Sequence, residues 1–287
     1  VNEKSFIELV TQRIKFFKNF NFNRWKQHQV KDEFSQPIFL IGFPRSGTTL
    51  LDTILRTNQS IEVIEEKPVL RNFLRNLNIK IKNNFNHLDN LEEKFIQNMQ
   101  NVYFEEREQY LENKKTKTVI DKMPLNIIHI AEILRFFPNA KFIFALRNPY
   151  DSVLSCFMQQ FELNPAMKNF ISLESSVILY DLVMELWIIY RDVFPINYHF
   201  IKYEDLVTDF EKTTKELFKF LEIDWSDNTK NFYITAQKRL NISTPSHNQV
   251  TSPLYTRSIN RWKNYEKEFK DLKNILDPWL DEFNYKI

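Results

Sequence analysis

The sequence keeps two glycines among its 287 residues, Gly42 and Gly47, and both fall within residues 42–49. Ordinary glycine usage of about 7% would place roughly 20 in a chain of this length. We therefore expect both where the backbone geometry excludes a side chain. Their spacing fits the phosphate-loop pattern G-x-x-x-x-G-K-[ST], with Thr48 in place of the lysine. Backbone N–H groups of such a loop bind an anionic phosphate, and Arg45 would supply the positive charge that the missing lysine does not.

This loop pattern allows other interpretations. A strand-to-helix turn that needs glycine only for its bend has the same spacing. ATP or GTP with magnesium is disfavoured, because the loop has no lysine and no apolar strand ends in an aspartate of the magnesium-binding type. The predicted ligand is therefore a phosphate ester other than a nucleoside triphosphate. A P-loop kinase that uses ATP and a non-catalytic nucleotide-binding module remain as alternatives.

A second group that could bind an anion follows a different apolar run. Arg147 comes directly after residues 141–146, and Asn148 or Pro149 can open a helix that carries Ser155. Ligands of open α/β sheets bind at the carboxyl ends of the strands, where Arg147 would lie. An arginine that only caps a neighbouring element is the alternative.

Strands and helices must alternate to place these two segments side by side. Short apolar runs bounded by turn residues predict strands at 37–41, 118–120, 141–146 and 198–201. Helical periodicity predicts helices at 48–56, 69–77, 91–111, 126–136, 150–161 and 173–193. This alternation is typical of βαβ units. We predict an α/β, P-loop-like three-layer fold with a central parallel sheet flanked by helices, plus helical additions.

The chain divides into two parts by pattern. Residues 1–35 combine an amphipathic helical segment with a polar connector, and residues 36–287 form one domain that carries the motifs. With 43% hydrophobic residues, the chain is long enough for a sizeable core. Because it begins at Val1, we expect it to be a piece of a longer protein, and an upstream helical repeat region stays open.

Composition argues against several classes. A net charge of +2 from 39 basic and 37 acidic residues predicts no bulk nucleic-acid binding. The single cysteine, Cys156, excludes an internal disulfide framework and fits a reducing compartment. The five histidines contain no close pair, so no metal site is expected. No run approaches about 18 apolar residues and no signal peptide is recognisable, which predicts no membrane span and a cytoplasmic location.

Taken together, residues from about Pro37 to Tyr265 resemble the sulfotransferases that use 3′-phosphoadenosine 5′-phosphosulfate (PAPS). They are most similar to protein-tyrosine sulfotransferases and to bacterial tetratricopeptide-repeat-associated sulfotransferases. The resemblance implies a 5′-phosphosulfate loop at residues 44–49, a 3′-phosphate pair at Arg147 and Ser155, and a closing loop from Ser246 onward. The cofactor-binding residues that it implies are Arg45, Ser46, Gly47, Thr48, Thr49, Arg147, Ser155, Tyr203, Ser246, Tyr255 and Arg261.

The resemblance also implies the catalytic groups. Glu66, 21 residues after Arg45, matches the general base, and Lys122 matches the lysine that stabilises the transferring group. Cytosolic small-molecule sulfotransferases have a histidine in the corresponding stretch, so Lys122 indicates the glutamate-base branch. His247 is a competing base candidate. The implied catalytic residues are Glu66, Lys122, Arg45 and Ser246.

The implied reaction is in-line transfer of a sulfuryl group from PAPS to an acceptor hydroxyl, without a metal. The acceptor stays open among a peptide tyrosine, a sugar hydroxyl and a small phenol, and so does a homodimer. Two positions depart from the family pattern. Gln159 stands where the family has an arginine, and Arg261 stands where it has a lysine.

Overall fold

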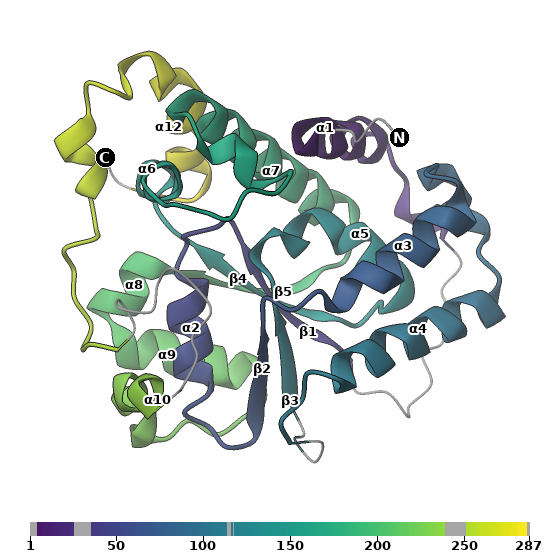
Figure 1. Cartoon of the computed structure of the whole chain (residues 1–287), viewed down its shortest axis with the longest axis horizontal. Helices are drawn as coiled ribbons and strands as arrows, with labels where there is room; N and C mark the ends of the chain where they lie inside the picture. Colours follow the sequence, from purple (N-terminus) through teal and green to yellow (C-terminus); the bar gives the residue numbers. More distant parts are fainter. Residues whose placement is uncertain (1–4, 26–35, 114–115, 117, 239–250, 286–287) are drawn as a thin grey trace.

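The computed structural model describes residues 5–25, 36–113, 116, 118–238 and 251–285. In this part of the chain, five parallel strands form one sheet in the spatial order β2-β3-β1-β4-β5 (Figure 1). The strands are β1 (Ile38–Gly42), β2 (Ile61–Glu65), β3 (Thr118–Lys122), β4 (Lys141–Leu146) and β5 (Asn197–Lys202). The predicted parallel sheet is confirmed. Strand β2 was not predicted, because Glu62 and Glu65 break its apolar run.

Helices cover both faces of the sheet, so the predicted three-layer α/β fold is also confirmed (Figure 1). Successive residues of β1 point to opposite faces: Phe39 and Ile41 belong to one apolar cluster and Leu40 to the other. The larger cluster is built with α1 (Phe6–Phe17), α3 (Val69–Ile81), α4 (Glu93–Glu108), α5 (Ile130–Phe136), α6 (Pro149–Phe157), α7 (Leu173–Val193) and α12 (Lys273–Glu282). The smaller cluster is built with α2 (Thr48–Leu55), α8 (Tyr203–Thr208), α9 (Phe210–Phe220) and α10 (Phe232–Lys238).

The observed helices follow the predicted ranges with local differences. Helix α7 has the predicted bounds, and α2 is shorter by one residue. The predicted helix 126–136 is split into a 3-10 helix at Pro124–His129 and α5. The predicted helix 150–161 ends at Phe157. The helices that follow β5 were not predicted.

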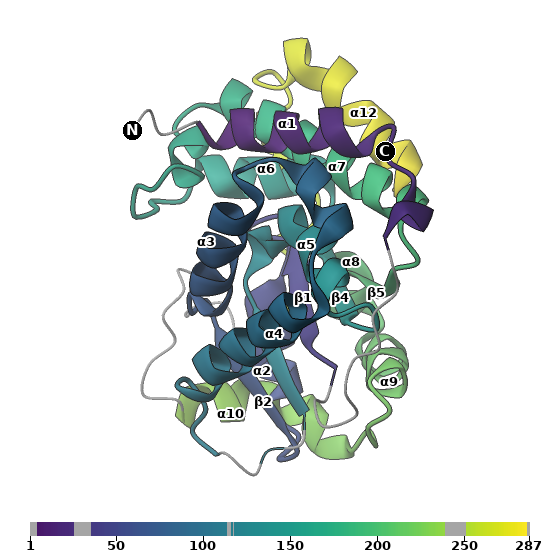
Figure 2. The same cartoon turned by 90° about the vertical axis from the view of Figure 1, so that its right-hand side faces the viewer.

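Helix α1 lies along α7 (Figure 2) and is tied to α5 by a buried ion pair. A capping box fixes its start, because Ser5 and Glu8 each accept a hydrogen bond from the other's backbone N–H. The Arg13 guanidinium pairs with Glu132, and its Nε donates to the carbonyl oxygen of Ile128 at 3.0 Å. Both charged side chains are buried, so α1 is part of the core.

No helix in the described ranges has the length and apolar character that a membrane crossing requires.

Candidate active site

The loop between β1 and α2 places both glycines where a side chain would be strained. Gly42 has φ +154°, and a Cβ there would lie 2.4 Å from the carbonyl oxygen of Ala145. Gly47 has φ +96° at the N-cap of α2, and a Cβ there would lie 3.0 Å from a ring carbon of Tyr203. The expectation that backbone geometry excludes a side chain at these two positions is confirmed.

The loop turns tightly and leads into the N-terminus of α2. The Ser46 hydroxyl donates to the carbonyl oxygen of Phe43 at 2.7 Å, so this side chain stabilises the loop. Arg45 adopts a left-handed backbone conformation, with φ +68°. The first N–H groups of a helix have no partner within the helix, and the helix dipole adds positive potential there. Thr48 and Thr49 therefore begin α2 at a position suited to an anion.

Arg147 leaves the end of β4 beside this loop, as predicted. The Asn148 side chain caps α6 by accepting from the N–H of Tyr150 at 3.0 Å, and Pro149 takes the first helical position. Arg147 donates from Nη1 to the carbonyl oxygen of Arg45 at 3.1 Å. Its guanidinium lies 5.0 Å from the ring centre of Tyr203. The two segments predicted to bind phosphate are thus in direct contact.

A second contact joins the loop to α6. Arg45 donates from Nε to the Ser155 hydroxyl at 3.1 Å. Burial lowers the pKa of the Arg45 guanidinium, while the Cys156 thiol raises it and Arg147 lowers it further. A guanidinium this deeply desolvated interacts strongly with any anion that reaches it.

The segment after residue 251 closes one side of the site. The Asp151 carboxylate on α6 accepts from the N–H of Asn260 at 2.7 Å and from the N–H of Trp262 at 2.9 Å. The Trp262 ring stacks on Tyr150 with 4.3 Å between ring centroids. These contacts place Tyr255 and its neighbours beside the loop. No role was predicted for Asp151 from the sequence.

These elements surround one cavity of about 590 Å³. The predicted site residues that line it are Arg45, Gly47, Thr48, Thr49, Glu66, Arg147, Ser155, Tyr203, Tyr255 and Arg261. Two predicted residues lie behind its surface, since the Ser46 hydroxyl is used inside the loop and Lys122 is fully buried. Ser246 and His247 lie outside the described residues.

Other lining residues were not expected from the sequence. Met123, Leu125, Phe161 and Met167 contribute apolar surface to the cavity wall. Met123 and Leu125 lie one and three residues after Lys122 in the chain. This closeness to a predicted catalytic residue was the only sign in the sequence that they would line the site. Gln159, by contrast, lies beyond the end of α6 and does not line the cavity within the described part of the chain.

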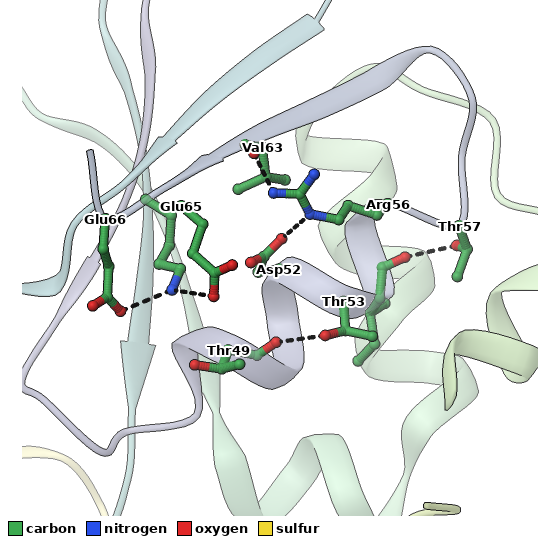
Figure 3. A network of polar contacts seen from close by, with 10 residues as sticks. Thr49, Asp52, Thr53, Arg56, Thr57, Val63, Glu65 and Glu66 are labelled. Atoms are coloured by element: carbon green, nitrogen blue, oxygen red, sulfur yellow. Dashed lines mark hydrogen bonds and ion pairs between the residues drawn. The ribbon is translucent and has the colours of Figure 1, made fainter. Parts of the chain in front are cut away.

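Glu66 reaches the cavity from the end of β2 (Figure 3). The Lys122 ammonium lies 2.8 Å from Oε1 of Glu66 and 3.2 Å from Oε1 of Glu65. The Lys122 side chain is 0% exposed, that of Glu65 7% and that of Glu66 38%. The structure therefore brings the two predicted catalytic residues together, with a buried ammonium behind a partly exposed carboxylate.

Helix α2 holds β2 in place. Arg56 pairs with the Asp52 carboxylate on the same helix and donates to the carbonyl oxygen of Val63 on β2 (Figure 3). β2 is an edge strand that pairs with β3 alone in the described sheet, and this side-chain bridge adds a further tie to it. The bridge thereby positions the strand end that carries Glu65 and Glu66.

Asp121, the neighbour of Lys122, lies on the opposite face of β3. Neither of its carboxylate oxygens has a hydrogen-bond partner among the described residues, and the side chain is buried. Burial raises the pKa of Asp121 to about 7, and the charge of Arg107 on α4 lowers it in part. Asp121 does not line the described cavity, so it does not take the place of a magnesium-binding aspartate there.

Comparison with known proteins identifies the family. Residues 37–227 match the model described as the sulfotransferase family. The chain belongs to the sulfotransferase family. An uncharacterized protein of Aquifex aeolicus (strain VF5) is 27% identical over 272 residues, which cover 88% of this chain and 35% of that protein. This chain therefore spans about a third of the length of that relative.

Solved sulfotransferase structures share the fold. The sulfotransferase domain from the Synechococcus PCC 7002 olefin synthase superposes with a TM-score of 0.56 at 20% identity, covering 83% of this chain and 91% of that domain. The sulfotransferase domain from the curacin biosynthetic pathway gives a TM-score of 0.55 at 18% identity, covering 88% of this chain and 99% of that domain. At these identities the likeness establishes the arrangement of the sheet and helices.

Proposed function

We propose that the chain transfers a sulfuryl group from PAPS to an acceptor hydroxyl, with Glu66 as the general base. The observation that carries this proposal is that one cavity is lined both by Glu66, held by the buried Lys122, and by the glycine loop with Arg147 and Ser155. Membership of the sulfotransferase family supports the reaction class.

The residues around the cavity fit a nucleotide with phosphates at both ends of its ribose. Gly47 keeps space open beside Tyr203, which a Cβ would occupy. The buried Nε of Arg147 has no hydrogen-bond partner among the described residues, so it can donate to a phosphate oxygen. In our proposal the backbone of Gly47 and the start of α2 hold the 5′-phosphosulfate, and Arg147 with Ser155 holds the 3′-phosphate.

Three charged side chains perform the proposed chemistry. PAPS supplies, when bound, the sulfuryl group, whose S–O bond to the 5′-phosphate breaks as an S–O bond to the acceptor forms. Glu66 accepts the proton of the acceptor hydroxyl as that oxygen attacks. Lys122 and Arg45 donate hydrogen bonds to the oxygens on which negative charge builds up. The donor leaves as adenosine 3′,5′-bisphosphate.

The apolar wall of the cavity supports a class of acceptor. Met123, Leu125 and Phe161 provide a surface that an aromatic ring would cover and remove from water. In our proposal the acceptor hydroxyl is therefore carried by an aromatic ring, as in a peptide tyrosine or a small phenol.

Nucleotide binding tests this function. We expect adenosine 3′,5′-bisphosphate at 100 times its dissociation constant to stabilise the wild type by about 2.7 kcal/mol, and ATP with magnesium to have a much smaller effect. Arg147→Ala should remove most of this stabilisation. Arg75→Ala, which removes the same charge from the exposed surface of α3, should not. A protein stabilised only by ATP with magnesium would be a kinase candidate and would contradict the proposal.

A further inference from the structure

Two consecutive carboxylates contact the same ammonium, which regular strand geometry does not allow. Side chains of successive strand residues point to opposite faces. Glu65 is in register with Lys122 on the neighbouring parallel strand, so these two side chains share a face. Glu66 leaves the strand in a left-handed conformation, with φ +50°, and its carboxylate returns to the same ammonium. The chain thus places one carboxylate on each side of Lys122.

The two carboxylates differ in their surroundings. Glu65 is 7% exposed and does not line the cavity in the part of the chain that the structure describes. Glu66 is 38% exposed and lines it. A buried ammonium without a counter-charge is costly. Glu65 supplies this ammonium with a second counter-charge, which is more buried than that of Glu66.

We propose that Glu65 is a positioning residue that anchors the Lys122 ammonium at the point where it meets both Glu66 and the sulfuryl group of the donor. This inference rests on the proposed function. An ammonium has three N–H donors. Glu65 and Glu66 accept two of them, and no further acceptor contacts this ammonium among the described residues. In our proposal the third donates to an oxygen of the sulfuryl group. Glu65 touches neither substrate and acts through Lys122.

A different role for Glu65 makes the opposite prediction. If Glu65 only balanced charge, its neutralisation would remove a negative charge near an anionic donor, and PAPS would bind more tightly. If Glu65 fixes the place of the ammonium, its neutralisation lets Lys122 move towards Glu66, and PAPS binds less tightly. The sign of the change separates the two roles.

The experiment measures the dissociation constants of PAPS and of adenosine 3′,5′-bisphosphate by calorimetry. Only PAPS carries the sulfuryl group that Lys122 would contact. We expect Glu65→Gln to weaken PAPS binding about tenfold, the loss of one hydrogen bond to a charged group, and to leave bisphosphate binding unchanged. Glu65→Asp keeps the charge but shortens the side chain that holds the Lys122 ammonium, so it should also weaken PAPS binding.

Two control comparisons test whether Glu65 affects PAPS binding through Lys122. In a Lys122→Met background, Glu65→Gln should cause no further loss of PAPS affinity, because the group that it positions is gone. Glu62→Gln makes the same change on the same strand, where the carboxylate instead accepts from Asn113 and Thr116, and it should leave the affinities for both nucleotides unchanged. Thermal unfolding of each variant identifies any that fail to fold.

The outcomes separate this inference from the proposed function. If the wild type binds neither nucleotide, the proposed function fails and the role of Glu65 fails with it. If the wild type binds both and Glu65→Gln binds PAPS equally or more tightly, only the role of Glu65 is overturned. If Glu65→Gln lowers the affinity for PAPS equally in the wild type and in the Lys122→Met background, the role of Glu65 is also overturned. Should Glu65→Gln not fold, Glu65→Asp decides by the same criterion.

Discussion

Glu66 and Lys122 are joined twice. The backbone N–H of Glu66 donates to the carbonyl oxygen of Lys122 at 2.8 Å, and the Lys122 ammonium donates to Oε1 of Glu66 at 2.8 Å. The first contact fixes where the Glu66 side chain begins, and the second fixes where its carboxylate ends. The proposed base is therefore oriented by the protein alone, which lowers the entropic cost of aligning it with an acceptor.

Replacement of this base should slow turnover strongly while the nucleotide still binds. We expect Glu66→Gln to reduce kcat with 4-methylphenol and PAPS about 100-fold or more, because the amide cannot take the hydroxyl proton. The affinity for adenosine 3′,5′-bisphosphate, measured by calorimetry, should change little. Turnover that persists in Glu66→Gln would move the role of base to another group, with His247 the first to test.

Alanine at each glycine should destabilise the protein, and to different degrees. Gly47→Ala forces a side chain into φ +96° against a movable Tyr203 ring, and we expect a loss of about 1–3 kcal/mol. Gly42→Ala meets the backbone oxygen of Ala145 at 2.4 Å, which cannot move without displacing β4. Urea unfolding should therefore show a lower midpoint for Gly42→Ala than for Gly47→Ala. A higher midpoint for Gly42→Ala than for Gly47→Ala would contradict this prediction. It would mean that the loop around residue 42 can shift away from the Ala145 oxygen at little cost.

The buried carboxyl of Asp121 should make stability depend on pH. Its folded-state pKa of about 7 lies above its ordinary value of 3.8, so the folded protein holds this proton where the unfolded chain has lost it. Stability should fall as pH rises from about 4 to about 7, by an amount on the order of a few kcal/mol. We expect Asp121→Asn to raise the melting temperature at pH 8 and to flatten this dependence. Equal melting temperatures for both proteins at pH 8 would contradict this account.

The buried pair of Arg13 and Glu132 should show strong coupling. Burial alone would raise the pKa of Glu132, but the charge of Arg13 and the contact with His129 lower it to about 2. Arg13→Met removes the guanidinium from a buried carboxylate, and we expect a loss of about 3–5 kcal/mol. Arg13→Met combined with Glu132→Gln should recover part of that loss. Denaturant titrations of the two single variants and the double variant give the coupling energy directly.

The parts of the site that depend on local backbone chemistry could be predicted from the sequence. Gly42 and Gly47 could be placed because a left-handed or crowded backbone position tolerates no other residue at low cost, and Arg147 could be placed because Asn148 and Pro149 mark the start of a helix. These features predicted the loop, the strand end and the order of the main elements.

Other parts depend on contacts between distant segments. The run Ile61–Glu65 was not predicted as a strand, because a polar Glu65 is not expected in a buried strand. Its burial is compensated by the Lys122 ammonium on β3, which the sequence pattern does not show. The closing segment is held by Asp151 through backbone N–H groups, a contact that leaves no trace in side-chain type. Spacing along the chain does not reveal such pairings, so the positioning roles of Glu65 and Asp151 emerged only from the structure.

The burial of α1 has a consequence for how the protein is made. Arg13 contacts Ile128, 115 positions later, and the Phe17 ring packs 5.2 Å from that of Tyr190. At synthesis rates of about 5–20 residues per second, roughly 8 to 35 s pass between the emergence of α1 and that of α7. During this interval the side of α1 that packs on α7 has no partner in the nascent chain. We therefore expect α1 to complete its packing only after α7 has been made.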